Sequence, residues 1–260
     1  MNKLLLTRDG KKQEMDSSLI LEENTVIINE TTFLFIDARD SQENLTLVIA
    51  PEVELQLSIL GFQSANHFSF LLKKDARVSV SHFGIDSCDS YQVVLQEEGA
   101  KIRYCYSSLT RNSAVIPIEI KHMAQHTESE ISNHCFQVAG DYTFDVTGIV
   151  LKNCAGCICN QENQIINLTH GKSKIHPNLL IDHYDVVANH SAYVGKFSKE
   201  VLFYLASRGL NPKESYVLLL TGFLLGKMSL SDELKGRFEN KIQEYGGERN
   251  ESGGFSNFTA

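Results

Sequence analysis

The chain has no excess of positive charge and no long apolar run. It carries 24 Lys and Arg residues against 32 Asp and Glu residues, a formal net charge of −8. This charge argues against non-specific binding to nucleic acid, because the phosphate backbone calls for a cationic surface. No apolar segment reaches the roughly 18–20 residues that cross a bilayer. The first residues, MNKLLLTRDGKKQ, hold too short an apolar core for a signal peptide. We therefore expect no nucleic-acid partner and no membrane.

Cysteine is sparse, and the common nucleotide and hydrolase motifs are missing. Six cysteines in 260 residues are too few for a disulfide scaffold, so we interpret them as reduced thiols of a cytoplasmic protein. The chain contains no G-x-x-x-x-G-K-[ST] loop, no G-x-G-x-x-G after a strand and no G-x-S-x-G. These absences predict that the chain does not hydrolyse ATP by itself.

Most of the chain alternates between apolar and polar residues. This period of two extends from Asn24 to about Gly195 and predicts short strands with one buried and one solvated face. In three clear runs the apolar positions are Val53, Leu55, Leu57 and Ile59; Ala100, Ile102, Tyr104 and Tyr106; and Ile116, Ile118 and Ile120. The polar partners of the second run are Lys101, Arg103, Cys105 and Ser107. Turn-forming clusters at 40–44, 61–66, 97–99 and 140–141 separate the strands. The pattern indicates a sandwich, a barrel or a β-helix, and no exact repeat period decides among them.

After Gly195 the apolar period becomes helical. Ser198 is a candidate N-cap for a helix through VLFYLAS, and Gly209 suits the left-handed residue after its end. Residues 211–214, Asn-Pro-Lys-Glu, predict the start of a second helix through SYVLLLTGFLLGKM. A third helix is expected to begin near Ser229. Its apolar stripe is Leu230, Leu234, Phe238, Ile242 and Tyr245.

These patterns divide the chain into three parts. Residues 1–195 form a mainly β core domain, and residues 196–246 form a segment of about three helices. Residues 247–260 are polar and rich in Gly and Ser, which predicts a disordered tail.

The segment Pro177–Gly209 carries the most specific motif. Its sequence, PNLLIDHYDVVANHSAYVGKFSKEVLFYLASRG, resembles the SufD signature P-x-L-x-I-x-x-D-D-V-x-x-S-H-G-A-x-V-G-x-L…L-F-Y-L-x-S-R-G. That signature belongs to the SufB/SufD family of iron–sulfur cluster assembly scaffolds. The matching residues are Pro177, Leu179, Ile181, Asp185, Val186, His190, Ala192, Val194, Gly195, Leu202, Phe203, Tyr204, Leu205, Ser207, Arg208 and Gly209. So many matches in one window make a strong signal.

A second block lies upstream. Residues 120–131, IKHMAQHTESEI, resemble the family pattern V-K-H-x-A-P-x-T-x-S-E-I, and the likeness extends over about 120–228. Tyr184, Ser191 and Tyr193 depart from the usual Asp, Gly and Thr. The C-G-A-H-T-F-P segment of SufB proteins is missing, so the chain is nearer SufD. It also lacks the N-terminal helical region of long SufD proteins and resembles a minimal form.

The resemblance implies a fold and a set of partners. The fold would be a right-handed parallel β-helix capped by the C-terminal helices. The function would be that of a SufD-like, non-enzymatic subunit of a scaffold complex. Residues 196–246 would dock the SufC ATPase, and a SufB-like chain or a second copy of this one would pair along the β-helix. Phe203, Tyr204, Arg208 and Gly209 are the candidate docking residues.

His190 is the candidate residue for cluster assembly. The resemblance implies a position at the interface with SufB, where an iron–sulfur cluster would be held transiently. A neutral imidazole is a good iron ligand and titrates near neutral pH. The alternative is a structural His that closes the last coil before the helices.

Cys154, Cys157 and Cys159 form the densest group of soft ligands. Thiolates suit zinc and iron–sulfur clusters, but three thiols fall short of the four ligands of a closed site. In a strand, Cys154 would also face away from the other two. The family pattern has no cysteine at these positions, and buried reduced cysteines are an alternative interpretation.

Two other functions compete with the scaffold hypothesis. The first is a stand-alone metal-binding structural protein that uses the three clustered cysteines. The second is a polysaccharide-active enzyme, since such enzymes share the β-helix and fold does not fix function. The enzyme hypothesis ranks lowest, because the chain has no signal peptide and no carboxylate cluster.

Overall fold

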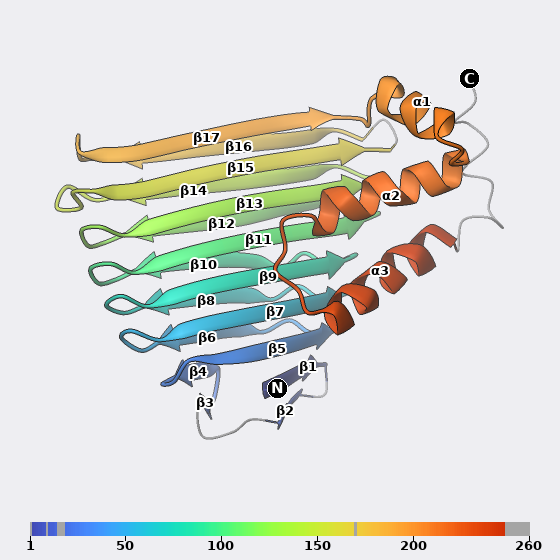
Figure 1. Ribbon diagram of the computed structural model, residues 1–260. Coiled ribbons are helices and arrows are strands. Elements are labelled where there is room, and N and C mark those ends of the chain that lie inside the picture. Colours follow the sequence, from blue (N-terminus) through green and yellow to red (C-terminus); the bar gives the residue numbers. More distant parts are fainter. Residues whose placement is uncertain (1, 9, 15–18, 169–170, 248–260) are drawn as a thin grey trace.

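The computed structural model describes residues 2–8, 10–14, 19–168 and 171–247, and it confirms a parallel β-helix. From β4 onward, successive strands alternate between two sheets, so each coil contributes one strand to each sheet (Figure 1). In spatial order, the nine-stranded sheet contains β17 (Val186–Gly195), β15 (Cys157–Asn167), β13 (Glu128–Gln137), β11 (Lys101–Thr110), β9 (Arg77–Ile85), β7 (Glu54–Phe62), β5 (Thr32–Arg39), β1 (Asn2–Thr7) and β2 (Gly10–Glu14). The eight-stranded sheet contains β16 (Ser173–Ile181), β14 (Tyr142–Val150), β12 (Ala114–His122), β10 (Ser90–Leu95), β8 (His67–Leu72), β6 (Asn44–Ile49), β4 (Thr25–Ile28) and β3 (Leu19–Glu22).

The coils differ in length, which explains why no repeat period is visible in the sequence. Leu34 pairs with Leu57, 23 positions later, whereas Ile131 pairs with Gln161, 30 positions later. The added residues lie in the turns, while the strands keep their register. One predicted turn was misplaced: β7 continues through Phe62, so the turn after it begins at Gln63, whose φ is +49°.

The main core fills the space between the two sheets. The apolar positions predicted to face one way along β7, β11 and β12 are buried there. Tyr91 and Tyr104 stack in its middle with ring centroids 3.9 Å apart. Burial of a large apolar side chain contributes about 1.5–3 kcal/mol. This inner face is therefore the main source of stability.

A second core lies outside the β-helix, between the nine-stranded sheet and two helices. The outward side chains near the ends of its strands pack against α2 (Pro212–Leu225) and α3 (Asp232–Gly247). Phe83 of β9, for example, lies 5.4 Å from Phe238 of α3 between ring centroids. The prediction that Cys105 and Ser107 face solvent was wrong, because the end of α2 and the turn after it cover them. The thiol of Cys105 donates to the Lys227 carbonyl at 3.2 Å, and Ser107 donates to the Leu224 carbonyl at 2.6 Å.

The helix starts follow the predicted capping residues. The Ser198 hydroxyl accepts from the Val201 amide at 3.2 Å at the start of α1 (Lys199–Ser207). Asn211 and Glu214 form a reciprocal capping box at α2. The third helix begins at Asp232 rather than near Ser229, because the Ser229 amide donates to the Ser81 hydroxyl of β9 at 3.0 Å.

Gly209 has φ +90°, as predicted for a left-handed residue after a helix. The tail from residue 248 onward and the Tyr245 side chain lie outside the described residues. Among the described helices, none is long and apolar enough to cross a membrane.

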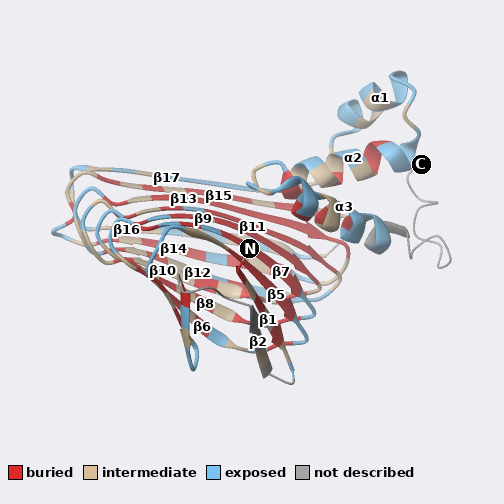
Figure 2. Cartoon of the chain, turned by 60° about the horizontal axis from the view of Figure 1, so that its bottom comes forward, coloured by how far each residue is buried: buried red, intermediate tan, exposed pale blue. Residues whose placement is uncertain are grey.

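Antiparallel strands close the N-terminal end of the β-helix. β1 pairs parallel with β5 and antiparallel with β2, while β3 pairs antiparallel with β4. Leu4, Leu6 and Leu19 point into the main core from these strands and are buried. Figure 2 shows this end, with β1 and β2 at the edge of the nine-stranded sheet. The sequence patterns did not predict this change of strand direction.

Candidate functional site

The C-terminal end of the β-helix is open. β16 and β17 form its last coil, and each has a neighbouring strand on one side only. Side chains that are buried on lower coils are exposed here. Leu6 and Val194 stand at opposite ends of one column of paired residues, yet Leu6 is 0% exposed and Val194 is 42% exposed. Figure 2 shows β17 mainly in the colours of exposed and intermediate residues.

His190 lies on this last coil. It pairs with Gln161 of β15 and shares strand parity with Val186 and Ala188 of β17, so its side chain continues an inward-facing column. No further coil covers it, and it is exposed. Its imidazole has no hydrogen bond or ion pair with any residue that the structure describes. The predicted cluster-assembly residue is therefore accessible from outside the molecule.

A small polar pocket adjoins His190. Its volume is about 230 Å³, and its lining includes Asn160, Asn189 and Ser191 from the outer faces of β15 and β17. Glu162 and Lys227 lie in the same lining and form an ion pair. Because Lys227 belongs to the turn after α2, this pair ties the helical segment to the coil beside His190.

His134 completes this polar group. Its Nε2 lies 3.4 Å from a Glu162 carboxylate oxygen, and its ring stacks on Phe223 of α2 with centroids 4.9 Å apart. Burial lowers the pKa of His134, and the bond to Glu162 offsets part of that effect. Burial raises the pKa of Glu162, but the hydrogen bond and charge of Lys227 bring it below its ordinary value. Sequence reasoning missed Glu162 and Lys227, because they are 65 residues apart and belong to no motif.

Exposed apolar side chains surround the open end. Tyr184, in the turn before β17, is 96% exposed, and Leu180 of β16 is 58% exposed. Val187 and Tyr193 of β17 are also exposed. Two edge strands with exposed apolar side chains are a template for pairing with another chain.

The candidate docking residues gather on α1. No residue of α1 is buried, and Phe203 and Tyr204 are 76% and 55% exposed. The Arg208 guanidinium lies 5.2 Å from the centre of the Tyr204 ring. Gly209 follows at the turn to α2, with no atom within 4 Å of the place that a Cβ would take. The four residues therefore form one exposed end of the helical segment, and their role in docking stays a prediction.

The three clustered cysteines are buried together at the start of β15. Cys154, Cys157 and Cys159 pack with Val150 in a small apolar cluster. Burial raises the pKa of Cys154 and of Cys159. Within the described part of the chain, no three His, Cys, Asp or Glu side chains are grouped so that they could hold a metal ion. A metal site at these cysteines stays a prediction, and the packing favours buried thiols.

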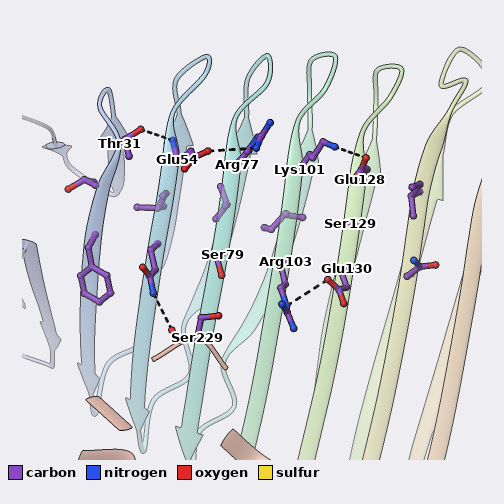
Figure 3. A pocket seen from close by; sticks show the side chains of 18 residues that line it. Thr31, Glu54, Arg77, Ser79, Lys101, Arg103, Glu128, Ser129, Glu130 and Ser229 are labelled. Atoms are coloured by element: carbon purple, nitrogen blue, oxygen red, sulfur yellow. Dashed lines mark hydrogen bonds and ion pairs between the residues drawn. The ribbon is translucent and has the colours of Figure 1, made fainter. Parts of the chain in front are cut away.

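A larger groove of about 950 Å³ runs along the outer face of the nine-stranded sheet (Figure 3). Its charged side chains pair across neighbouring strands. These pairs are Glu54–Arg77 at 3.8 Å, Lys101–Glu128 at 2.6 Å and Arg103–Glu130 at 3.7 Å. Each of these carboxylates thus has a basic partner on the neighbouring strand.

The architecture is that of a parallel β-helix with helices packed on one sheet. Residues 44–223 match the family described as "SUF system FeS cluster assembly, SufBD core domain". The chain therefore belongs to the SufBD core family.

A curated relative places it nearer SufD. The chain is 31% identical over 108 residues to "Iron-sulfur cluster assembly protein SufD" of Bacillus subtilis (strain 168). The match covers 41% of this chain and 25% of that protein. The chain thus aligns with about a quarter of its relative's length.

Proposed function

We propose that this chain is a SufD-like, non-enzymatic subunit of an iron–sulfur cluster assembly complex. The observation that carries the proposal is the uncovered last coil, which presents His190 in a chain of the SufBD core family. The partner at this end is a SufB-like chain or a second copy of this one. The iron–sulfur cluster is cargo that this interface handles transiently. The six free thiols fit the reducing cytoplasm.

A SufC-like ATPase docks on the helical segment through α1. The support is the exposure of Phe203 and Tyr204, since buried aromatic anchors dominate the energetics of many interfaces. The α2–α3 turn is joined to β15 by the Lys227–Glu162 pair, so movement of the docked ATPase would reach the strand that pairs with the strand of His190.

The docking assignment is tested by co-purification with a SufC-like ATPase. Phe203→Ala with Tyr204→Ala should weaken binding by roughly 100-fold or more, the effect of losing two anchors of about 2 kcal/mol each. Val115→Ala is the matched control, because Val115 is 66% exposed on the eight-stranded sheet, far from α1. Undiminished binding by the double variant would remove α1 from the interface.

The role of His190 is tested by cluster reconstitution on the assembled complex under anaerobic conditions. His190→Ala should leave the complex assembled and lower the yield of bound cluster about tenfold or more, as loss of a metal-site residue does. His176→Ala is the control, since His176 is exposed on β16 and faces outward. Equal cluster yields from the two variants would assign His190 a structural role.

A further inference from the structure

The turn between β14 and β15 brings two thiols together in a C-x-x-C motif. Cys154, Ala155, Gly156 and Cys157 form this turn, and Gly156 adopts φ +66°. Such a conformation suits Gly and folds the chain back on itself. Both thiols consequently lie in the same buried cluster, at the rim of the β-helix.

The two sulfur atoms contact carbonyls that are two residues apart in the chain. Cys154 Sγ donates to the His122 carbonyl at 3.3 Å, and Cys157 Sγ donates to the Ala124 carbonyl at 3.2 Å. His122 is the last residue of β12, and Ala124 lies in the turn that follows. Burial raises the pKa of Cys154, and the charge of Cys157 adds to this effect.

A hydrogen-bonded network holds Cys157 in position. Its Sγ lies 3.2 Å from the Thr127 hydroxyl, which lies 2.8 Å from Nδ1 of His122. Nε2 of His122 lies 2.9 Å from the Ser129 hydroxyl. Because every member of this network is buried, Cys157 has little freedom to turn away from Cys154.

We propose that Cys154 and Cys157 are a redox-active dithiol that closes to a reversible intrachain disulfide. The oxidant is a low-molecular-weight disulfide. One Cys thiolate attacks it and forms a mixed disulfide, and the other Cys thiolate then displaces the second small thiol. Two Cys thiols and one small disulfide thus become one protein disulfide and two small thiols. The inference does not depend on the proposed function.

Access for the oxidant comes from the position of the turn. Lys152 and Asn153 directly before it are exposed, so a local opening of the turn admits a small molecule. Burial raises the pKa of Cys154, and the thiolate is the reactive form. While the turn remains closed, oxidation of the two thiols is therefore slow. The disulfide forms only during sustained exposure to the oxidant.

Closure of the disulfide would stiffen the coil that leads to the open end. The Ala155 carbonyl accepts from the His126 amide at 3.0 Å, and the Gly156 amide donates to the Asp185 carbonyl at 2.8 Å. Asp185 directly precedes β17, the strand of His190. The dithiol is thus one turn away from the proposed interface.

The experiment uses the folded full-length chain, incubated with oxidised glutathione, blocked with N-ethylmaleimide and analysed by mass spectrometry of its peptides. We expect two of the six free thiols to be lost together, in a peptide with an internal disulfide, and to return with dithiothreitol. Cys159→Ser is the matched control and should form the same disulfide. Cys154→Ser and Cys157→Ser should not form it and should retain a mixed disulfide with glutathione.

Two results would overturn the inference. One is an unchanged thiol count in the folded chain at a glutathione disulfide concentration that oxidises the same cysteines in the unfolded chain. The other is loss of the internal disulfide in Cys159→Ser, which would assign the pair to Cys159. Unfolding curves of each variant establish that the chain remains folded during the assay.

Discussion

The two ends of the β-helix differ in how far their inward side chains are covered. At the N-terminal end, the antiparallel strands β2 and β3 cover the first coil, and Leu4 and Leu6 are buried. At the C-terminal end, β17 has no outer neighbour and its inward side chains Ala192 and Val194 are exposed. Proteins generally protect strand edges because an open edge invites pairing with another chain. The exposed inward side chains at the C-terminal end therefore support the proposal that this end is a binding surface.

The helical segment also contains covered and uncovered parts. α2 and α3 bury apolar side chains against the nine-stranded sheet, whereas α1 buries none. A helix of nine residues is marginal by itself in water. Its exposed aromatic side chains gain most from a partner that covers them.

The largest expected effect sharpens the contrast between the covered and uncovered helices. Phe238→Ala in α3 should destabilise the chain by about 3–5 kcal/mol, because it leaves a cavity next to Phe83. Phe203→Ala in α1 should change the free energy of unfolding by less than about 0.5 kcal/mol, as an exposed substitution does. Urea unfolding measures both, and equal effects would show that α3 is not part of the second core.

A second pair of substitutions compares the two ends within one column of paired residues. Leu6→Ala should cost about 2–5 kcal/mol, since it removes a buried side chain from the covered end. Val194→Ala at the open end should cost less than about 1 kcal/mol in the isolated chain. Denaturant unfolding separates the two cases. A larger loss for Val194→Ala would mean that the open end is closed in solution.

The third prediction concerns acid stability near the open end. Burial lowers the pKa of His122 to about 4, below its ordinary value of 6.5. The unfolded chain therefore takes up a proton first as pH falls, and stability drops between about pH 6.5 and pH 4. The loss attributable to His122 approaches about 3 kcal/mol below that window.

The measurement is the free energy of unfolding against pH, compared between the wild type and His122→Gln. The variant should show a shallower decline over this window, whatever its stability at pH 7. Burial also lowers the pKa of His134. The free energy of unfolding should therefore still decline with falling pH in both proteins. Parallel curves would show that His122 has the same pKa in the folded and the unfolded chain.

The smallest expected effect lies at the boundary between the uncovered and covered helices. Asn211→Ala removes the capping box at the start of α2 and should cost about 1 kcal/mol. Asn211→Asp keeps an acceptor for the Glu214 amide and serves as the control. Thermal or urea unfolding checks the difference, and equal stability of the two variants would show that the cap is dispensable.

The sequence predicted the parts of the fold that follow from local chemistry. Period-two patterns located the buried positions of β7, β11 and β12, and capping residues located the starts of α1 and α2. The choice of a β-helix came from the resemblance at Pro177–Gly209, because coils of unequal length show no repeat. The burial of Cys105 was not predictable, since it depends on Lys227 in a turn that lies 122 residues later.

The candidate site was predictable only in part for the same reason. His190 stands in a motif and could be singled out from the sequence. Its exposure results from the lack of a further coil over β17, which no local pattern reveals. The Glu162–Lys227 pair beside His190 depends on how the helices pack on the sheet. The antiparallel strands at the N-terminal end depend on the direction of turns, which alternation of apolar and polar residues does not specify.

The measurement that most directly tests the open end as the binding surface is the mass of the assembly, by analytical ultracentrifugation, with and without a SufB-like partner. Ala192→Asp places a charge on the open end, in the column whose far end is Leu4. We predict that the variant keeps its free energy of unfolding and fails to assemble with either a second copy or the SufB-like chain. Assembly of the variant with wild-type affinity would contradict this account.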